Sequence, residues 1–341
     1  MKVDFYKHPL SPNNHLSLKK ILDGDIITSG PIGELVEKKL SKYLNVKNVI
    51  LTSSWTSGAI ATLLSLTLKK NDEVILPSMT FAATANVVEL LGAKPVFVDI
   101  DKDTILTSYE EVIKKITKKT KVIFPVHLYG NMFDTKKLNI FIKKKKLKIN
   151  IIEDSAHSLE SSIQGYKSGK WSKAAIFSFY ATKNITCGEG GAVITNDKKF
   201  AIKIKKLKNF GLTQTALEKY KSKKHNEVDM KDLGIKANLS DLLSFLLLPQ
   251  IKNIKKNLLL RKKIYNRYLN LLKNTNIKIP KIPLKCSSAF HIFVIGVEKR
   301  KRNKILNYLK KKKIGCSIHY KPLHKMTYYK KKYKLKDKNF P

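Results

Sequence analysis

Short apolar runs alternate with helical patterns through the first two thirds of the chain, and this alternation most constrains the fold. Such runs, separated by amphipathic or buried helices, are typical of a parallel sheet that is covered on both faces. The 341 residues, 43% of them hydrophobic, suffice for a large core. The sequence therefore predicts an α/β fold with a mainly parallel central sheet. Strands are expected at 48–53, 72–78, 94–100, 121–130, 149–156 and 174–179, with helices at 57–68 and 84–93 among them.

The pattern changes after about residue 245. A long helix is expected at 244–274, followed by a strand at 289–297 and a basic helix at 302–313. We therefore expect two domains, a large one over residues 1–245 and a smaller α+β one over residues 246–341.

The formal net charge of +42 raises the question of nucleic-acid binding. Only four of the 68 basic residues are arginine, the residue that reads base edges best: Arg261, Arg267, Arg300 and Arg302. Lysines also occur on almost every expected helix rather than on one face. We therefore expect solvated, lysine-rich surfaces without a specific nucleic-acid partner, and weak nonspecific attraction to polyanions is the alternative.

Cysteine usage and hydropathy restrict the protein class further. Cys187, Cys286 and Cys316 are widely spaced and odd in number, which favours free thiols over a disulfide framework or a zinc site. No apolar run reaches membrane-spanning length, and the N-terminal stretch lacks the apolar core of a signal peptide. We expect a cytoplasmic protein that neither spans a membrane nor holds a metal.

Polar residues follow the expected strands, at the edge of the sheet where α/β proteins bind ligands. Thr56 and Ser57 stand at the start of a helix, where free N–H groups and the helix dipole attract a phosphate. Either hydroxyl could instead serve only as a helix cap.

A carboxylate and a lysine follow two of these strands. Asp154 ends an apolar run, where a carboxylate is scarce unless it caps a loop or has a functional partner. Opposite a cationic ring nitrogen it would hold that nitrogen protonated, as a pyridoxal cofactor requires. Lys183, in the turn before "GEGG", would have a lowered pKa beside such a cofactor and could form an imine with its aldehyde.

Six segments, in the same order, resemble the DegT-type sugar aminotransferases. They are residues 75–101, 126–134, 151–161, 176–197, 233–242 and 314–324. The likeness runs from about residue 25 to the C-terminus. It implies the pyridoxal-phosphate transferase fold of type I, with the cofactor in the large domain.

The resemblance also implies roles for single residues. Lys183 matches the Schiff-base lysine and proton-transfer base, and Asp154 matches the partner of the pyridinium nitrogen. Phe81, otherwise a core candidate, matches the aromatic residue that stacks on the cofactor ring, and His157 lies where relatives approach its phenolic oxygen. The phosphate ligands are matched by Thr56, Ser57, Ser178 and Asn238, the last reaching the neighbouring subunit's cofactor, which implies a homodimer with shared sites.

The implied reaction moves an amino group from glutamate, through the pyridoxamine phosphate form, to a keto group of a nucleotide-linked deoxysugar. Segments 177–191 and 236–242 favour amination at C4 over C3. The segment that contains His319, Tyr320 and His324 matches one that, in relatives, lies on the side of the active site where the sugar nucleotide binds. A packing role for these three is the alternative.

Two departures leave other functions open. Trp55 stands where relatives have a small residue, and we expect it to alter the pocket wall. Measured against the family, the small domain is expected to be shortened at its end. A scaffold or regulatory protein that keeps the fold without turnover is therefore one alternative. A pyridoxal-phosphate-dependent sugar dehydratase relative is another, but there a histidine replaces the lysine, and Lys183 argues against it.

Overall fold

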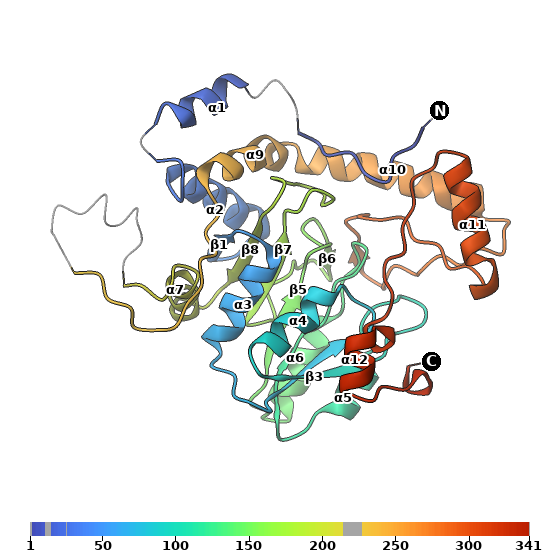
Figure 1. Cartoon of the computed structure of the whole chain (residues 1–341). Coiled ribbons are helices and arrows are strands. Elements are labelled where there is room, and N and C mark those ends of the chain that lie inside the picture. The colour runs from blue at the N-terminus through green and yellow to red at the C-terminus, as the bar shows by residue number, and fades with distance from the viewer. Residues whose placement is uncertain (1, 11–14, 25, 214–226, 341) are drawn as a thin grey trace.

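A seven-stranded, mostly parallel sheet forms the centre of the protein (Figure 1). The computed structural model describes residues 2–10, 15–24, 26–213 and 227–340. Only β8 runs antiparallel to its neighbours. In sheet order the strands are β1 (Asn48–Thr52), β8 (Gly191–Thr195), β7 (Ala174–Ser178), β5 (Asn150–Asp154), β4 (Thr120–Ile123), β2 (Glu73–Pro77) and β3 (Lys94–Val98).

All six strands expected in this region are confirmed, although the fourth is shorter than predicted. Strand β4 ends at Ile123, and beyond it only Val126 forms an isolated bridge, to Asp154. Pro125 offers no N–H for a ladder, which explains why regular pairing stops there. The sequence analysis missed β8, whose five residues are all buried between β1 and β7.

Helices cover both faces of the sheet, and alternate strand residues point to each face. One face packs against α3 (Trp55–Ser65), α4 (Ala82–Leu90) and α7 (Lys198–Leu207). On the other face, α2 (Pro31–Leu44) and α9 (Asp241–Lys252) cover one half. The second half of that face lies under α5 (Tyr109–Lys115) and α6 (Thr135–Lys144).

The expected single helix at 244–274 is wrong, because the chain forms two helices there. Helix α9 ends at Lys252 and α10 spans Ile254–Leu272, with Asn253 between them. The Asn253 side chain donates to the carbonyl oxygen of Pro249 at 3.1 Å, competing with the helical hydrogen bonds at the junction. Of α10, only Ile254 is buried. The predicted basic helix is confirmed as α11 (Lys299–Lys311).

The strand expected at 289–297 is also wrong. In this part of the chain the short strand β9 (Cys286–Ser287) pairs with β6 (Ser162–Ile163). Ala289 then donates its N–H to the carbonyl oxygen of Gly130, and Phe290 has a φ of 48°. A positive φ breaks the extended path, so the apolar pattern here reflects packing in a connecting segment rather than a ladder.

The C-terminal elements return to the large sheet. They are η2 (Leu323–Lys325), α12 (Thr327–Lys332) and η3 (Asp337–Asn339). Leu323 and Tyr329 belong to the hydrophobic cluster that contains β2, β3 and α4, and Figure 1 shows α12 lying over this part of the sheet. The domain division near residue 245 stays a prediction. Short helix α1 spans His15–Leu22. Across the described residues, every helix is too short or too polar to cross a membrane.

Candidate active site

A cluster of hydroxyl groups lies where β1 gives way to α3. Ser54 is the N-cap of α3, and its Oγ accepts a hydrogen bond from the Ser57 N–H at 3.0 Å. Ser57 Oγ accepts in return from the Ser54 N–H at 3.0 Å and lies 3.0 Å from Ser53 Oγ. The helix therefore begins two residues earlier than predicted. Ser57 takes part in the cap, and Thr56 is the second residue of the helix.

Gly191 allows β8 to approach this helix start closely. A Cβ atom at Gly191 would lie 2.6 Å from backbone atoms of Ser54 and Trp55, so no side chain fits. Gly191 also pairs with Ser178 in the sheet, which places the Ser178 position one strand away from the helix start. The expectation for Trp55 is wrong. Its indole is 7% exposed and donates to the carbonyl oxygen of Ile176, because the ring packs into the core instead of lining the site.

Asn238 lies beside the same helix start within its own chain. The Ser53 N–H donates to the carbonyl oxygen of Ala237 at 2.8 Å, which brings the following residue to this edge of the sheet. The side-chain amide of Asn238 lies 3.3 Å from that of Asn209.

Asp154 is a buried carboxylate at the end of β5. Its Oδ2 accepts from the Thr84 hydroxyl at 2.9 Å, and its Oδ1 accepts from the Ala156 N–H at 3.1 Å. Burial raises the pKa of Asp154, while these hydrogen bonds and the charge of Lys183 oppose the rise. A loop-capping role would explain the hydrogen bond that Oδ1 accepts from Ala156, but not the one that Oδ2 accepts from Thr84.

Lys183 projects from a turn that follows β7, and its N–H donates to the carbonyl oxygen of Tyr180 at 2.9 Å. Burial lowers the pKa of Lys183 to about 8, against the opposing charge of Asp154. Because each of the two charges shifts the pKa of the other, the fold has brought the amine and the carboxylate into one site.

Three ring side chains complete this site. His157 accepts the Tyr129 N–H on Nδ1 at 3.3 Å, and its Nε2 lies 3.4 Å from the Tyr320 hydroxyl. The Phe81 ring centroid lies 5.7 Å from that of Tyr320, and Phe81 is 60% exposed at the start of α4. The alternative that Phe81 is a core residue is therefore wrong, and the Phe81 ring is free to cover a ligand.

The structure separates the three residues expected on the substrate side, because His319 and Tyr320 join the site and His324 does not. Burial and the nearby charge of Lys183 lower the pKa of His319, so this ring belongs to the same site, next to Tyr320. His324 is 4% exposed, with Nδ1 2.6 Å from Ser78 Oγ and its ring stacked on Phe340. His324 thus packs at the C-terminal end of the chain and, in the contacts described, does not meet Lys183.

Sequence reasoning missed several residues that shape the site, Thr84, Asn184 and His291 among them. Thr84 lies in α4, three residues after Phe81, the N-cap of this helix. Burial and the charge of Lys183 lower the pKa of His291 well below its usual range. No local signal marks His291, because its contact with the site depends on the path of the 289–297 segment.

The model of the DegT/DnrJ/EryC1/StrS aminotransferase family matches residues 11–341. An uncharacterized protein of Methanocaldococcus jannaschii is 36% identical over 330 residues, which cover 94% of this chain and 84% of that protein.

Two solved structures are similar to this protein over nearly the whole chain. Spr1654 of Streptococcus pneumoniae, assigned as a sugar aminotransferase and solved in a PMP form, is 31% identical with a TM-score of 0.93, covering 99% of this chain and 90% of that one. PseC of Helicobacter pylori, an aminotransferase of pseudaminic acid biosynthesis, is 27% identical with a TM-score of 0.87, covering 98% and 89%.

Proposed function

Because the chain belongs to the DegT/DnrJ/EryC1/StrS aminotransferase family, we propose that it transfers an amino group from glutamate to a keto group of a nucleotide-linked deoxysugar. The observation that carries this proposal is the pairing of the half-buried Lys183 with the buried Asp154, whose charges shift each other's pKa at the carboxyl edge of the sheet. The cofactor is pyridoxal phosphate, which the similar Spr1654 holds in its PLP and PMP forms.

The residues present fit this cofactor. Asp154 is a buried carboxylate whose pKa is raised by burial, so a cationic ring nitrogen would complete its environment. Phe81 offers an exposed aromatic face at the same place. Nδ1 of His319 is buried and has no hydrogen-bond partner among the described residues, which leaves a polar atom for a bound molecule.

The phosphate would be held at the start of α3. Ser54 and Ser57 cap each other there, and the second helical residue is Thr56. The N-terminal N–H groups of a helix and its dipole favour an anion. Ser178 on β7 and the partner subunit's copy of Asn238 are proposed to contribute further polar groups.

When bound, the cofactor supplies an aldehyde and a cationic ring that takes up electrons during amino transfer. Asp154 would keep the ring nitrogen protonated through its negative charge. Lys183, with a pKa of about 8, is available both as an amine and as an ammonium near neutral pH, so it can accept a proton and return it. His157 faces the Tyr320 hydroxyl and would hold the ring oxygen in place.

The substrate side of the proposal comes from the sequence resemblance. Segments 177–191 and 236–242 favour amination at C4 over C3, and His319 and Tyr320 are proposed to contact the sugar. His324 is a weaker candidate because it packs against Ser78 and Phe340.

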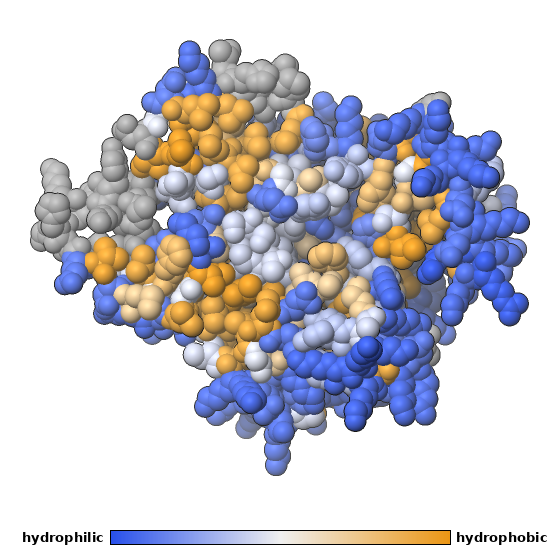
Figure 2. All heavy atoms as spheres, in the orientation of Figure 1, coloured by the Kyte–Doolittle hydropathy of each residue, from blue (hydrophilic) through white to orange (hydrophobic). Residues whose placement is uncertain are grey.

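The surface supports a homodimer with shared sites. Three apolar side chains near Asn238 in the sequence are exposed, namely Phe210, Met230 and Leu233 at 45%, 58% and 80%. Figure 2 shows apolar side chains gathered over α2 and α9, whereas hydrophilic side chains dominate the edge formed by α11. An apolar surface of this kind next to a site residue is typical of a subunit interface.

Amino transfer is tested by adding glutamate to the cofactor-loaded protein without a sugar. We expect the visible absorption band of the lysine-bound cofactor to be replaced by that of pyridoxamine phosphate, and Lys183→Ala to lack the visible band. A panel of nucleotide-linked keto sugars then identifies the acceptor, with product mass and NMR distinguishing C4 from C3. A loaded protein that glutamate leaves unchanged would contradict the proposed donor and favour the scaffold alternative.

Shared sites are tested by mixing two inactive variants. Lys183→Ala and Asn238→Ala subunits, each inactive alone, should regain activity when mixed, because a mixed dimer contains one site with both residues intact. Leu233→Lys should shift the protein toward a monomer in light scattering, whereas Leu284→Lys, at a residue that is 87% exposed before β9, should not. A monomeric wild-type protein at micromolar concentration argues against the dimer.

A further inference from the structure

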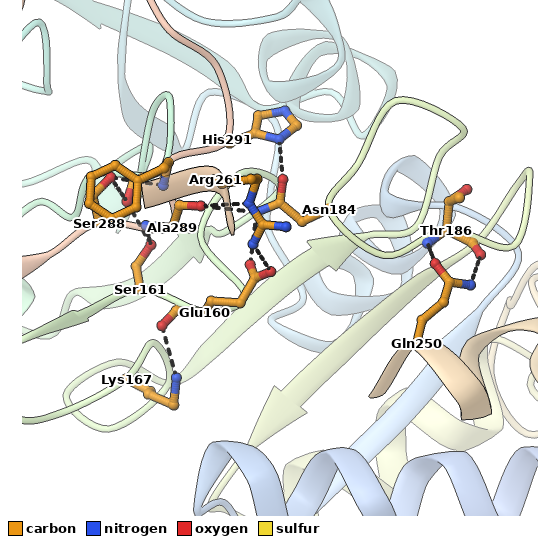
Figure 3. Close-up of polar contacts among 12 residues, drawn as sticks. Glu160, Ser161, Lys167, Asn184, Thr186, Gln250, Arg261, Ser288, Ala289 and His291 are labelled. Atoms are coloured by element: carbon orange, nitrogen blue, oxygen red, sulfur yellow. Dashed lines mark hydrogen bonds and ion pairs between the residues drawn. The ribbon is translucent and has the colours of Figure 1, made fainter. Parts of the chain in front are cut away.

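A partly buried chain of polar side chains leads from α10 to the Lys183 turn (Figure 3). Arg261 of α10 forms an ion pair with Glu160, and its Nε donates to the carbonyl oxygen of Ala289 at 3.1 Å. The Glu160 side chain is completely buried. Asn184, the neighbour of Lys183, donates from Nδ2 to the second oxygen of Glu160 at 2.9 Å.

The chain continues to His291. Oδ1 of Asn184 lies 2.7 Å from Nδ1 of His291, and the His291 ring centroid lies 4.4 Å from that of His157. Two histidine rings therefore stand side by side next to the Lys183 turn, at the end of a relay of hydrogen bonds that begins at Arg261.

The donor and acceptor roles along this relay are determined by Glu160. A carboxylate paired with a guanidinium only accepts hydrogen bonds, so the Asn184 amide must turn its nitrogen to Glu160. Its oxygen then faces His291, which must donate from Nδ1. The pKa of His291 lies well below its usual range, mainly because the ring is buried and further because of the charges of Lys183, Arg261 and His319. The ring is therefore uncharged, and its Nε2 carries a lone pair.

His157 has the opposite arrangement. Its Nδ1 accepts the N–H of Tyr129, so the proton of its uncharged ring is on Nε2, toward the Tyr320 hydroxyl. Burial, Lys183, His291 and His319 lower the pKa of His157 well below its usual range as well. One ring thus offers an N–H and the other a lone pair.

We propose that Glu160 and Asn184 are positioning residues, which hold His291 beside Lys183 as the Nδ1–H tautomer while His157 carries its proton on Nε2. His291 then presents an uncharged hydrogen-bond acceptor at the Lys183 site, and Arg261 balances the charge of Glu160 from α10. This inference relies on the proposed function only for the role of Lys183, and its main test needs no cofactor.

The substitution Glu160→Gln tests this assignment directly. In Glu160→Gln, Arg261 still donates to the oxygen of the introduced amide, so the amide nitrogen faces Asn184. The Asn184 amide should then reverse and give up the long hydrogen bond, 3.4 Å, from its nitrogen to the carbonyl oxygen of Ala289. Its nitrogen then faces His291, and Nδ1 of His291 becomes an acceptor. A substitution that changes one carboxyl oxygen to nitrogen should therefore reverse the tautomer of His291 and leave that of His157 unchanged.

Gln250 of α9 provides the matched control, because it holds the same turn without touching the relay. Its Oε1 accepts the Thr186 N–H at 2.9 Å, and its Nε2 donates to the Thr186 carbonyl oxygen at 2.6 Å. Gln250→Met should lower the melting temperature and leave both histidine tautomers as they are in the wild type.

The measurement is long-range ¹H–¹⁵N NMR of the full-length, cofactor-free protein with ¹⁵N-labelled histidine. Each of the eight histidines gives one pair of ring-nitrogen signals, and those of His157 and His291 are assigned with His157→Gln and His291→Gln. The wild type should show His291 with a proton on Nδ1 only and His157 with a proton on Nε2 only. In Glu160→Gln the His291 pattern should invert, and with cofactor the glutamate half-reaction should slow.

Three outcomes would overturn the inference: a wild-type His291 that is protonated on Nε2 or on both nitrogens, no change in Glu160→Gln, or the same inversion in Gln250→Met. The wild-type spectrum alone decides the first, even if a variant does not fold. A protein with the expected tautomers that glutamate leaves unchanged would count against the proposed function instead, so the two failures are distinguishable.

Discussion

At the scale of single residues, the properties of Lys183 come from where the fold places it. Many lysines of this chain are exposed, yet burial lowers the pKa of this one from 10.5 to about 8. The folded protein therefore binds fewer protons than the unfolded chain between about pH 8 and 10.5. Below pH 8 the folded state bears the full cost of a buried charge, and this cost disappears as the pH rises through that window.

Lys183→Met should therefore stabilise the cofactor-free protein at pH 7, by about 1–3 kcal/mol in the free energy of unfolding. The gain should shrink toward zero at pH 10.5, where the unfolded lysine also loses its charge. Urea denaturation of wild type and variant between pH 7 and 10.5 measures the difference. Lys170→Met, at an exposed site, is the control and should change little. A variant that is less stable than the wild type at pH 7 would show that the amine contributes stability.

The proposed site residues that the sequence predicts most directly are those with a local signature. Asp154 follows an apolar strand and Lys183 precedes a glycine-rich turn, so their places in the sequence point to the edge of the sheet. His291 has no such signature. It reaches the Lys183 site because the segment after β9 follows the Gly130 carbonyl rather than forming the expected strand.

At the scale of elements, the start of one helix is stabilised by a partner from a distant part of the chain. Helix α2 begins after Gly30, which has no side chain to cap it. Asp241, the first residue of α9, supplies the cap. Its Oδ1 accepts the N–H groups of Gly30 and Gly33, each at 2.9 Å, and its Oδ2 accepts that of Ile32 at 3.0 Å.

We expect Asp241→Ala to lower the free energy of unfolding by about 2–4 kcal/mol, since three N–H groups lose their acceptor at a buried site. Asp241→Asn should cost less, because one oxygen remains. Chemical denaturation gives both values. Asp103→Ala, which removes an exposed carboxylate 3.0 Å from Lys281, is the comparison and should cost less than about 1 kcal/mol. Equal effects of Asp241→Ala and Asp103→Ala would rule out this capping role.

At the scale of the whole molecule, the C-terminal segment closes over the sheet. Tyr329 of α12 is 2% exposed, its ring lies edge-on to Phe97 at 5.2 Å, and its hydroxyl donates to Oδ1 of Asn86 at 2.6 Å. The neighbouring Tyr328 is 57% exposed. The last helix therefore contributes one aromatic anchor to a core built mainly by residues before position 210.

Tyr329→Ala should destabilise the protein by about 3–5 kcal/mol, the usual cost of removing a buried aromatic ring. Tyr328→Ala should cost less than about 1 kcal/mol, because its side chain already contacts water. Thermal and urea denaturation of the two variants compare adjacent positions in the same helix. Similar losses for both would mean that α12 is not anchored through Tyr329.

The sequence by itself determined the alternation of six strands with helices, the mainly parallel sheet and the place of Lys183 and Asp154 near its carboxyl edge. These features follow from hydrophobic periodicity, which is a property of neighbouring residues. Only the tertiary structure decided that β8 inserts antiparallel between β1 and β7, that Asp241 caps α2, and that Glu160 and Asn184 orient His291. Those contacts join residues far apart in the chain, and their energies depend on burial and on donor and acceptor geometry, which no local pattern records.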